Sequence, residues 1–264
     1  MKAKVASIQY WLSDEKDKAQ RIREVEKLID KAGEADLILL PEVWNIGWRS
    51  FDKYEEGAEK IDGETISRIS DKAREVGAHI LAGSIIEKQG DDLFNTAVLL
   101  DPAGEVRATY RKIHLYTKTF DGLSESKLVE PGREIVTVKT ELGKIGLAIC
   151  NDLRFPELYR KMAVQEGVEI FLTIAAWPLV RVENWVELSH VRANENQSYL
   201  ISSNCAGFSR ETRFLGHSAV VDPHGISVAQ GGLSQCIVKS EIDLGKLRKF
   251  RKDVPHLRNR ILSV

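Results

Sequence analysis

The first forty residues alternate between short apolar runs and one amphipathic stretch, and this order restricts the possible folds. Residues 4–10 have the length and composition of a strand, and residues 22–32 carry apolar side chains at helical spacing, with Ser13 as the expected N-cap and Gly33 as the stop. Residues 36–40, Asp-Leu-Ile-Leu-Leu, form an apolar run typical of a strand covered on both faces. A strand, a helix and a second strand in this order predict a parallel βαβ unit and therefore an α/β fold.

The same two patterns continue along the rest of the chain. They predict an antiparallel hairpin over residues 94–110, around the turn Asp101-Pro102-Ala103-Gly104. Residues 117–132 lack clear periodicity, and a loop of this length is usually functional or disordered. Further helices are expected at 64–76, near 156 and at 184–196, and further strands at 79–86, 134–139, 144–149, 168–174, 200–205, 218–221, 226–230 and 236–242.

Composition narrows the class of protein. The 264 residues contain no Pro-, Gly- or Ser-rich linker, so we expect one domain over residues 1–264. The 38 basic and 39 acidic residues leave a net charge of -1, which argues against a nucleic-acid or membrane-surface partner. The start of the chain lacks the apolar stretch of a signal peptide, and no run approaches the ~18 residues of a membrane span, so a cytoplasmic location is expected. Cys150, Cys205 and Cys236 are too few and too scattered for a disulfide framework, so we expect reduced thiols.

Three chemically useful side chains each follow a predicted strand. Glu42 follows the second strand of the βαβ unit, Lys112 follows the hairpin, and Cys150 follows the strand at 144–149. In α/β folds the carboxyl ends of strands form ligand sites, and a thiol beside a helix N-terminus has nearby N–H groups that favour a thiolate and can stabilise an oxyanion. Each residue also fits a structural reading, as a surface carboxylate, a solvated lysine or a buried core cysteine.

Together these side chains match the needs of thiol-dependent acyl transfer. A thiol that attacks a carbonyl carbon needs a base, a cation or donor for the oxyanion, and a proton source for the leaving group. A second carboxylate beside the lysine would keep its ammonium group charged and oriented.

Other classes of protein fit the sequence less well. A metalloenzyme would need clustered ligands, but the six histidines stand apart and neither an HExxH motif nor a paired CxxC motif occurs. A nucleotide-binding protein would need a phosphate loop, and Gly143-Lys144 lacks both the upstream glycine and the following Ser or Thr. A catalytically silent binding module with the same fold is the main alternative to an enzyme.

The chain resembles the nitrilase superfamily of carbon–nitrogen hydrolases, in the amidase-like branch that includes the omega-amidases. The matching stretches occur in family order and cover nearly the whole chain. They are Leu-Leu-Pro-Glu ending at Glu42; Tyr110-Arg111-Lys112-Ile113-His114-Leu115; Glu125-Ser126 with Pro131-Gly132; Cys150-Asn151-Asp152-Leu153-Arg154-Phe155-Pro156-Glu157-Leu158-Tyr159-Arg160; Ala176-Trp177-Pro178 with Trp185; Arg192-Ala193-Asn194-Glu195-Asn196-Gln197; and Gly216-His217-Ser218 with Asp222-Pro223-His224-Gly225.

This resemblance implies a role for each matching residue. The catalytic glutamate of the family falls on Glu42, its lysine on Lys112, its nucleophile on Cys150 and its supporting glutamate on Glu125. The family uses the backbone N–H after the cysteine as an oxyanion donor, which here belongs to Asn151. Relatives usually carry an aromatic residue at that position, so the shape of the pocket beside the thiol is left open.

The resemblance also implies a four-layer α-β-β-α sandwich that pairs into dimers and larger assemblies. The basic C-terminal tail, at about 246–264, resembles the segment that relatives use at the subunit interface. We therefore expect a homodimer or a larger homo-oligomer, with no cofactor and no metal.

The substrate is the least determined property. Cys-Asn-Asp at the nucleophile differs from the Cys-Trp-Glu of true nitrilases, so we expect an amide, hydrolysed to a carboxylic acid and ammonia. Ala176-Trp177-Pro178 continuing to Arg181 resembles the omega-amidases, which act on the terminal amide of 2-oxo dicarboxylic acid monoamides. Arg154 or Arg181 would bind the distal carboxylate of such a substrate, although either arginine could instead form a surface or interface salt bridge. Trp44 and Trp177 would line the pocket. An aliphatic amidase, an N-carbamoyl amine hydrolase and, after these, a nitrilase are the alternatives.

Overall fold

Two six-stranded sheets stack face to face in the structure, a computed structural model that describes residues 1–119 and 122–263. The first sheet has the order β15 (Cys236–Asp243), β1 (Lys2–Gln9), β3 (Leu37–Leu39), β4 (His79–Gln89), β5 (Asp92–Leu100) and β6 (Val106–Arg111). The second has the order β14 (Ser227–Gln230), β13 (Ala219–Val221), β10 (Tyr199–Asn204), β9 (Ile170–Ala175), β8 (Gly143–Ile149) and β7 (Thr137–Thr140).

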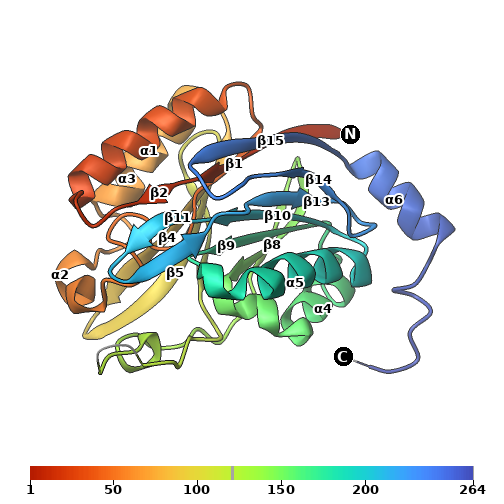
Figure 1. The fold of residues 1–264 in the computed structure, drawn as a ribbon. Coiled ribbons are helices and arrows are strands. Elements are labelled where there is room, and N and C mark those ends of the chain that lie inside the picture. Colours follow the sequence, from red (N-terminus) through yellow and green to blue (C-terminus); the bar gives the residue numbers. More distant parts are fainter. Residues whose placement is uncertain (120–121, 264) are drawn as a thin grey trace.

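Helices cover the outer face of each sheet (Figure 1). Helices α1 (Lys18–Ala32) and α3 (Glu64–Val76) lie on the first sheet, whereas α4 (Pro156–Val164) and α5 (Val182–Glu195) lie on the second. The expected four-layer α-β-β-α sandwich is therefore confirmed. The remaining elements are a small sheet of β12 (Thr212–Leu215), β11 (Ala206–Ser209) and β2 (Trp11–Leu12), the short helix α2 (Tyr54–Gly57), the C-terminal helix α6 (Leu244–Asp253) and the 3₁₀ turns η1 (Phe51–Lys53), η2 (Glu125–Lys127), η3 (Cys150–Arg154) and η4 (Leu179–Arg181).

Strand β3 shows why its sequence is apolar at every position. Leu37 and Leu39 pack into the core between the two sheets, while Ile38 and Leu40 pack into the core under α1 and α3. All four side chains are fully buried, and each buried aliphatic side chain contributes about 1.5–3 kcal/mol to folding. The predicted βαβ unit is confirmed because β1 and β3 pair in parallel.

Parallel pairing brings several strand ends to one edge of the molecule. In the first sheet β3 also runs parallel to β4, and in the second sheet β8, β9 and β10 are parallel neighbours. The predicted hairpin after residue 94 is formed by β5 and β6, which pair antiparallel. Glu42, Lys112 and Cys150 follow β3, β6 and β8 respectively, so the fold supplies these side chains from both sheets.

Three local predictions differ from the structure. Helix α1 is capped by Asp17 rather than Ser13, because the Asp17 carboxylate accepts from the Gln20 N–H while the Gln20 side chain accepts from the Asp17 N–H. The hairpin of β11 and β12 was not predicted. The loop expected at 117–132 contains η2, and residues 120 and 121 of that loop lie outside the described residues.

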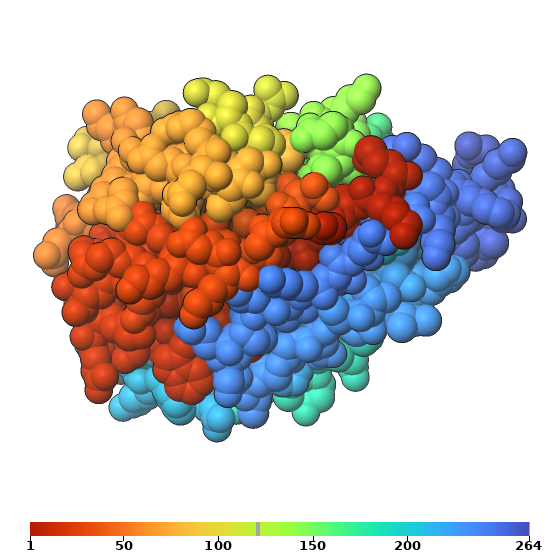
Figure 2. Space-filling model, turned by 90° about the horizontal axis from the view of Figure 1, so that it is seen from above, coloured from red at the N-terminus to blue at the C-terminus, as the bar shows by residue number. Residues whose placement is uncertain are grey.

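The first and last strands of the chain are neighbours in the first sheet. β1 pairs antiparallel with β15, and Figure 2 shows the red N-terminal segment lying beside the blue C-terminal segment. After α6 the chain continues as an extended tail away from the sheets (Figure 1). Across the described parts of the chain, no helix combines the length and the apolar character that crossing a membrane requires.

Candidate active site

Glu42 lies at the carboxyl end of β3, on a turn with an unusual backbone. The next residue, Val43, has φ +41°, a left-handed conformation that is strained for a β-branched side chain. The Glu42 side chain is fully buried, and its Oε2 accepts from the Ala176 N–H at 2.8 Å, just beyond β9 of the other sheet. A buried carboxylate is thus fixed between the two sheets.

Lys112 reaches this carboxylate from the end of β6. Its Nζ donates to Glu42 Oε1 at 2.8 Å and to the two carboxylate oxygens of Glu125 at 3.0 and 2.9 Å. All three side chains are fully buried. The structure therefore brings together one ammonium group and two carboxylates, as the sequence predicted.

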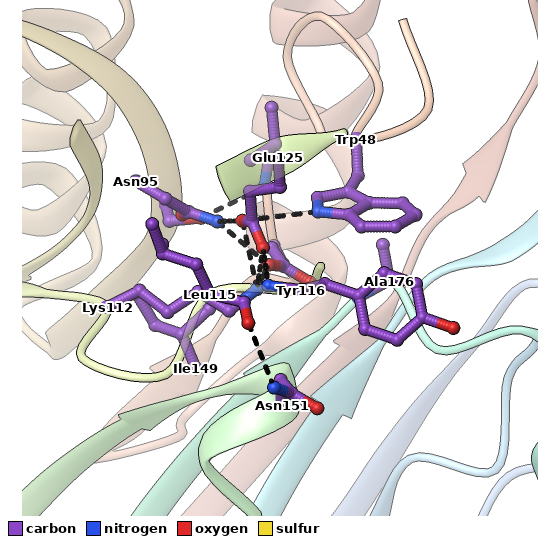
Figure 3. A network of polar contacts seen from close by, with 12 residues as sticks. Trp48, Asn95, Lys112, Leu115, Tyr116, Glu125, Ile149, Asn151 and Ala176 are labelled. Atoms are coloured by element: carbon purple, nitrogen blue, oxygen red, sulfur yellow. Dashed lines mark hydrogen bonds and ion pairs between the residues drawn. The ribbon is translucent and has the colours of Figure 1, made fainter. Parts of the chain in front are cut away.

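Glu125, on η2, is surrounded by donors (Figure 3). Besides Lys112, its carboxylate accepts from Asn95 Nδ2 at 2.8 Å, the Tyr116 N–H at 2.7 Å and Trp48 Nε1 at 3.4 Å. These contacts hold the Glu125 carboxylate in place against the Lys112 ammonium group.

Cys150 follows β8 and opens η3, so a short 3₁₀ turn, rather than α4 itself, begins at the thiol. Its backbone has φ +49°, a second left-handed residue beside a predicted catalytic group. The side chain is 6% exposed, and the Glu42 carboxylate is close enough to raise the pKa of the thiol. The sharp turn at the strand end presents the thiol to the carboxylate that was predicted to act as its base.

Burial and charge set the proton affinities of these groups. Burial raises the pKa of the Glu42 carboxyl, Lys112 opposes this effect, and the charge of Glu125 adds to it. Burial also raises the pKa of the Cys150 thiol well above its usual range, and the negative charge of Glu42 raises it further. Burial alone lowers the pKa of Lys112, but Glu125 and Glu42 raise it well above its ordinary value. The resting thiol is consequently neutral, and it needs a base within reach in order to attack.

A buried carboxylate connects the Cys150 turn to the segment that follows Lys112. Asp152 accepts from the Ile149 N–H at 2.9 Å and from the Tyr110 hydroxyl at 2.7 Å. It also accepts from the His114 N–H at 3.0 Å and lies 2.7 Å from His114 Nδ1.

Asn151 strengthens the same connection. Its side-chain Nδ2 donates to the carbonyl oxygens of His114 and Leu115, each at 3.2 Å (Figure 3). The Asn151 side chain therefore binds neighbouring backbone and also lines the cavity beside the thiol.

A small cavity of about 20 Å³ adjoins the thiol. Its lining residues are Trp48, Tyr116, Cys150, Asn151, Arg154, Ala176, Trp177, Pro178 and Arg181. A second cavity of about 260 Å³ shares Tyr116, Pro178 and Arg181 with the first and is also lined by Lys118 and Arg213. Both predicted arginines, Arg154 and Arg181, and the predicted Trp177 line the cavity beside the thiol. The Arg154 guanidinium lies over the Trp177 ring at 4.5 Å.

Trp44 is placed differently from the prediction. Its indole N–H donates to the Ala82 carbonyl at 2.9 Å and its ring packs edge-on against Tyr10, so the side chain is fully buried in the core. Among the described residues that line the cavity, Trp48 occupies the position expected for Trp44.

One contact of the site escaped the sequence analysis. Asn95, near the start of β5, donates to both predicted catalytic glutamates. The available signal was an amide between the apolar residues Phe94 and Ala97 of this strand, beside Thr96, which alone does not identify a partner. Within residues 1–119 and 122–263, no group of three or more His, Cys, Asp or Glu residues could hold a metal ion.

Comparisons with known proteins point to one family. The family described as carbon–nitrogen hydrolase matches residues 4–252. A 2-oxoglutaramate amidase from Paenarthrobacter nicotinovorans is 36% identical, with 97% of this chain and 88% of the relative covered. Omega-amidase NIT2 from Homo sapiens is 36% identical, with 86% and 83% covered. The solved structure of XC1258 from Xanthomonas campestris, a carbon–nitrogen hydrolase superfamily protein with an arsenic adduct in its active site, matches with a TM-score of 0.91 and 26% identity, covering 100% of this chain and 99% of that one.

Proposed function

Because the chain belongs to the carbon–nitrogen hydrolase family, and is thus an enzyme acting on non-peptide C–N bonds, we propose that it hydrolyses the terminal amide of a short 2-oxo dicarboxylic acid monoamide. Cys150 is the nucleophile in this proposal, Glu42 the general base and acid, and Lys112 the cation that holds the oxyanion. The products are a dicarboxylic acid and ammonia. The arrangement that carries the proposal is a buried thiol whose pKa is raised by a nearby buried carboxylate, which itself accepts a hydrogen bond from a buried lysine.

In the first half of the reaction, Glu42 takes the thiol proton while sulfur bonds to the amide carbon. The carbonyl oxygen becomes an oxyanion, which Lys112 Nζ and the Asn151 N–H hold. The C–N bond then breaks, and the proton on Glu42 passes to the departing nitrogen, so that ammonia leaves and a thioester remains on Cys150.

In the second half, water takes the place of ammonia. Glu42 removes a proton from this water as its oxygen bonds to the thioester carbon, and the same donors hold the second oxyanion. The C–S bond then breaks, the acid is released and the proton returns to the thiol. Glu125 takes no proton in either half, because its role is to keep Lys112 charged and aimed.

Two guanidinium groups in the cavity support an acidic substrate. Arg154 and Arg181 both line the nucleophile cavity, and in the described parts of the chain no ion pair with a carboxylate is found for either. A guanidinium group can bind a carboxylate through two hydrogen bonds. Arg181 also lines the second, larger cavity, so it stands where the distal carboxylate of a substrate with several carbons would lie. The names of the two relatives, 2-oxoglutaramate amidase and omega-amidase, support such a substrate.

A panel of ammonia-release assays tests the proposal. It compares 2-oxoglutaramate and succinamate with propionamide, a simple nitrile and an N-carbamoyl compound, for the wild type, Cys150→Ala and Arg181→Met. We expect the two acidic amides to be preferred, Cys150→Ala to be inactive, and Arg181→Met to raise KM for the acidic amides alone. Arg68→Met is the matched control, because Arg68 pairs with Glu26 on the helical surface.

Turnover of propionamide as efficient as that of the acidic amides would contradict the carboxylate grip and favour a neutral aliphatic amidase. Release of ammonia mainly from the N-carbamoyl compound would favour a carbamoyl amine hydrolase. If every compound failed while the protein was folded, the silent binding module would be the better explanation.

We also propose that the protein acts in the cytoplasm as a homo-oligomer. The free thiols of Cys150, Cys205 and Cys236 support the first statement, because reduced cysteines are typical of cytosolic proteins. The second is supported by the exposed apolar residues of the C-terminal tail, where Ile261 is 97% and Leu262 84% exposed. The tail at about 246–264 is the expected interface segment of the single domain.

A further inference from the structure

Asn95 lies at one side of the buried polar network, next to Glu125 (Figure 3). Its side chain is fully buried, and its single Nδ2 group donates to Glu42 Oε1 and Glu125 Oε1, each at 2.8 Å. Its backbone carbonyl accepts from the Lys112 N–H at 2.9 Å. One residue of β5 therefore contacts both carboxylates and fixes the backbone of the lysine between them.

The other half of this amide is poorly satisfied. Asn95 Oδ1 is buried and has no hydrogen-bond partner among residues 1–119 and 122–263. A buried acceptor without a partner costs about 1–3 kcal/mol, and such a group in a native structure calls for an explanation. The position of Asn95 is therefore better explained by what its N–H group does to the two glutamates than by a contribution to stability.

The electrostatics of the site show what that N–H group can do. Two carboxylates share one ammonium group away from water, and the other ionisable groups near Glu42 among the described residues include the Cys150 and Cys205 thiols and the Tyr54 hydroxyl. The Cys205 thiol donates to the backbone carbonyl of Glu42 rather than to its carboxylate. Tyr54 donates its proton to the Trp48 carbonyl, so this hydrogen is directed away from the carboxylates. The Asn95 amide is consequently a neutral donor placed between two like charges, where it stabilises both of them.

We propose that Asn95 is a positioning residue that bridges Glu42 and Glu125 and keeps Glu42 ionised, so that this carboxylate is ready to take the Cys150 proton. The inference rests on the proposed function, because it assumes that Glu42 is the base. Without the bridge, repulsion between the two carboxylates favours uptake of a proton. A proton already on Glu42 blocks transfer from the thiol, so the enzyme becomes inactive until the pH is raised.

Loss of the Asn95 donor should shift the pH profile of the enzyme in one direction. A donor to a carboxylate stabilises the charged form and lowers the pKa of the carboxyl, so its loss raises that pKa. The lower limb of the profile of kcat/KM against pH should therefore move to higher pH, by about one unit for one lost bond to a charged group. Below the limb this corresponds to roughly tenfold lower activity, which recovers as the pH increases.

The test compares Asn95→Leu, which removes the donor and keeps a similar volume, with Thr96→Val on the same strand. Thr96 is an apt control because its hydroxyl donates to another buried glutamate, Glu87, at 2.6 Å. Two profiles are measured against pH: kcat/KM for the preferred amide, and the rate at which iodoacetamide alkylates Cys150, located by peptide mass spectrometry. We expect the lower limb of both profiles to shift for Asn95→Leu and neither to shift for Thr96→Val.

Different outcomes separate this inference from the proposed function. A shifted alkylation profile in a protein that hydrolyses no amide would sustain the role of Asn95 and reject the substrate. A loss of activity that is equal at every pH, or profiles identical to the wild type, would overturn the role of Asn95. Asn95→Ser is the second variant, and failure of both variants to fold would also overturn the inference, because the amide would then be needed for the fold.

Discussion

Replacement of Asp152 by asparagine tests whether the Cys150 turn is held by a buried carboxylate. The two oxygens of Asp152 accept from four donors, namely the Ile149 N–H, the Tyr110 hydroxyl, the His114 N–H and the His114 ring. In the asparagine variant one oxygen becomes an NH₂ group. Two of the four donors then point at this NH₂ group. One of the two is the Tyr110 hydroxyl or the His114 ring, which can accept a hydrogen bond from the NH₂ group instead, but the other is a backbone N–H, which cannot accept.

The expected loss of stability follows from these hydrogen bonds. At least one backbone N–H is left buried without an acceptor, which costs about 1–3 kcal/mol. The remaining bonds lose the benefit of a charged acceptor, so the total loss in the free energy of unfolding should be about 3 kcal/mol. For a chain of this length, that corresponds to a fall in Tm of about 6–12 °C.

Urea and thermal unfolding of Asp152→Asn measure this loss directly. Asp222→Asn is the control, because Asp222 accepts only from backbone N–H groups in the turn between β13 and β14. We also expect kcat per folded molecule to fall about tenfold or more, since a displaced thiol no longer meets its base. An unfolding free energy within about 1 kcal/mol of the wild type would refute the reasoning.

Two further predictions concern the catalytic groups. Glu125→Gln should lower kcat strongly while the protein stays folded and Cys150 stays intact, because Lys112 loses a charged partner. Steady-state kinetics measure the loss of activity, and circular dichroism shows whether the protein is folded. Turnover equal to that of the wild type would contradict the role of Glu125 and make Glu130 the next residue to test. Incubation of the wild type with a slow amide substrate, quenched with acid before turnover is complete, should leave an acyl group on Cys150, detected by peptide mass spectrometry, because the thioester accumulates when its hydrolysis is slow. An adduct on the fully buried Cys205 would contradict the assignment.

Local patterns in the sequence were sufficient for several parts of the fold. The apolar run at 36–40 predicted a strand buried on both faces, because each side chain of β3 enters one of two cores. Polar residues directly after strands were also informative. Glu42, Lys112 and Cys150 come together because each follows a strand whose end lies at the same buried site.

Other features depend on distant contacts and could not be predicted in this way. The choice of Trp48 over Trp44 as a cavity wall depends on the path of an irregular loop, which has no periodicity to interpret. Asn95 gains its partners only when β5 lies beside Lys112 and η2 folds over both. The α1 cap at Asp17 was accessible in principle, because Asp17 and Gln20 have the spacing of a capping box.

The division of the site between two sheets has a mechanical consequence. Glu42 follows a strand of the first sheet and Cys150 follows a strand of the second, so the aliphatic layer between the sheets acts as a spacer between this carboxylate and this thiol. Protein interiors are dense and compress very little, so this spacer holds its thickness within narrow limits. The separation of the two groups therefore depends on the bulk of residues such as Leu39 and Leu147, which pack in this core and are not among the described residues that line the cavity beside the thiol.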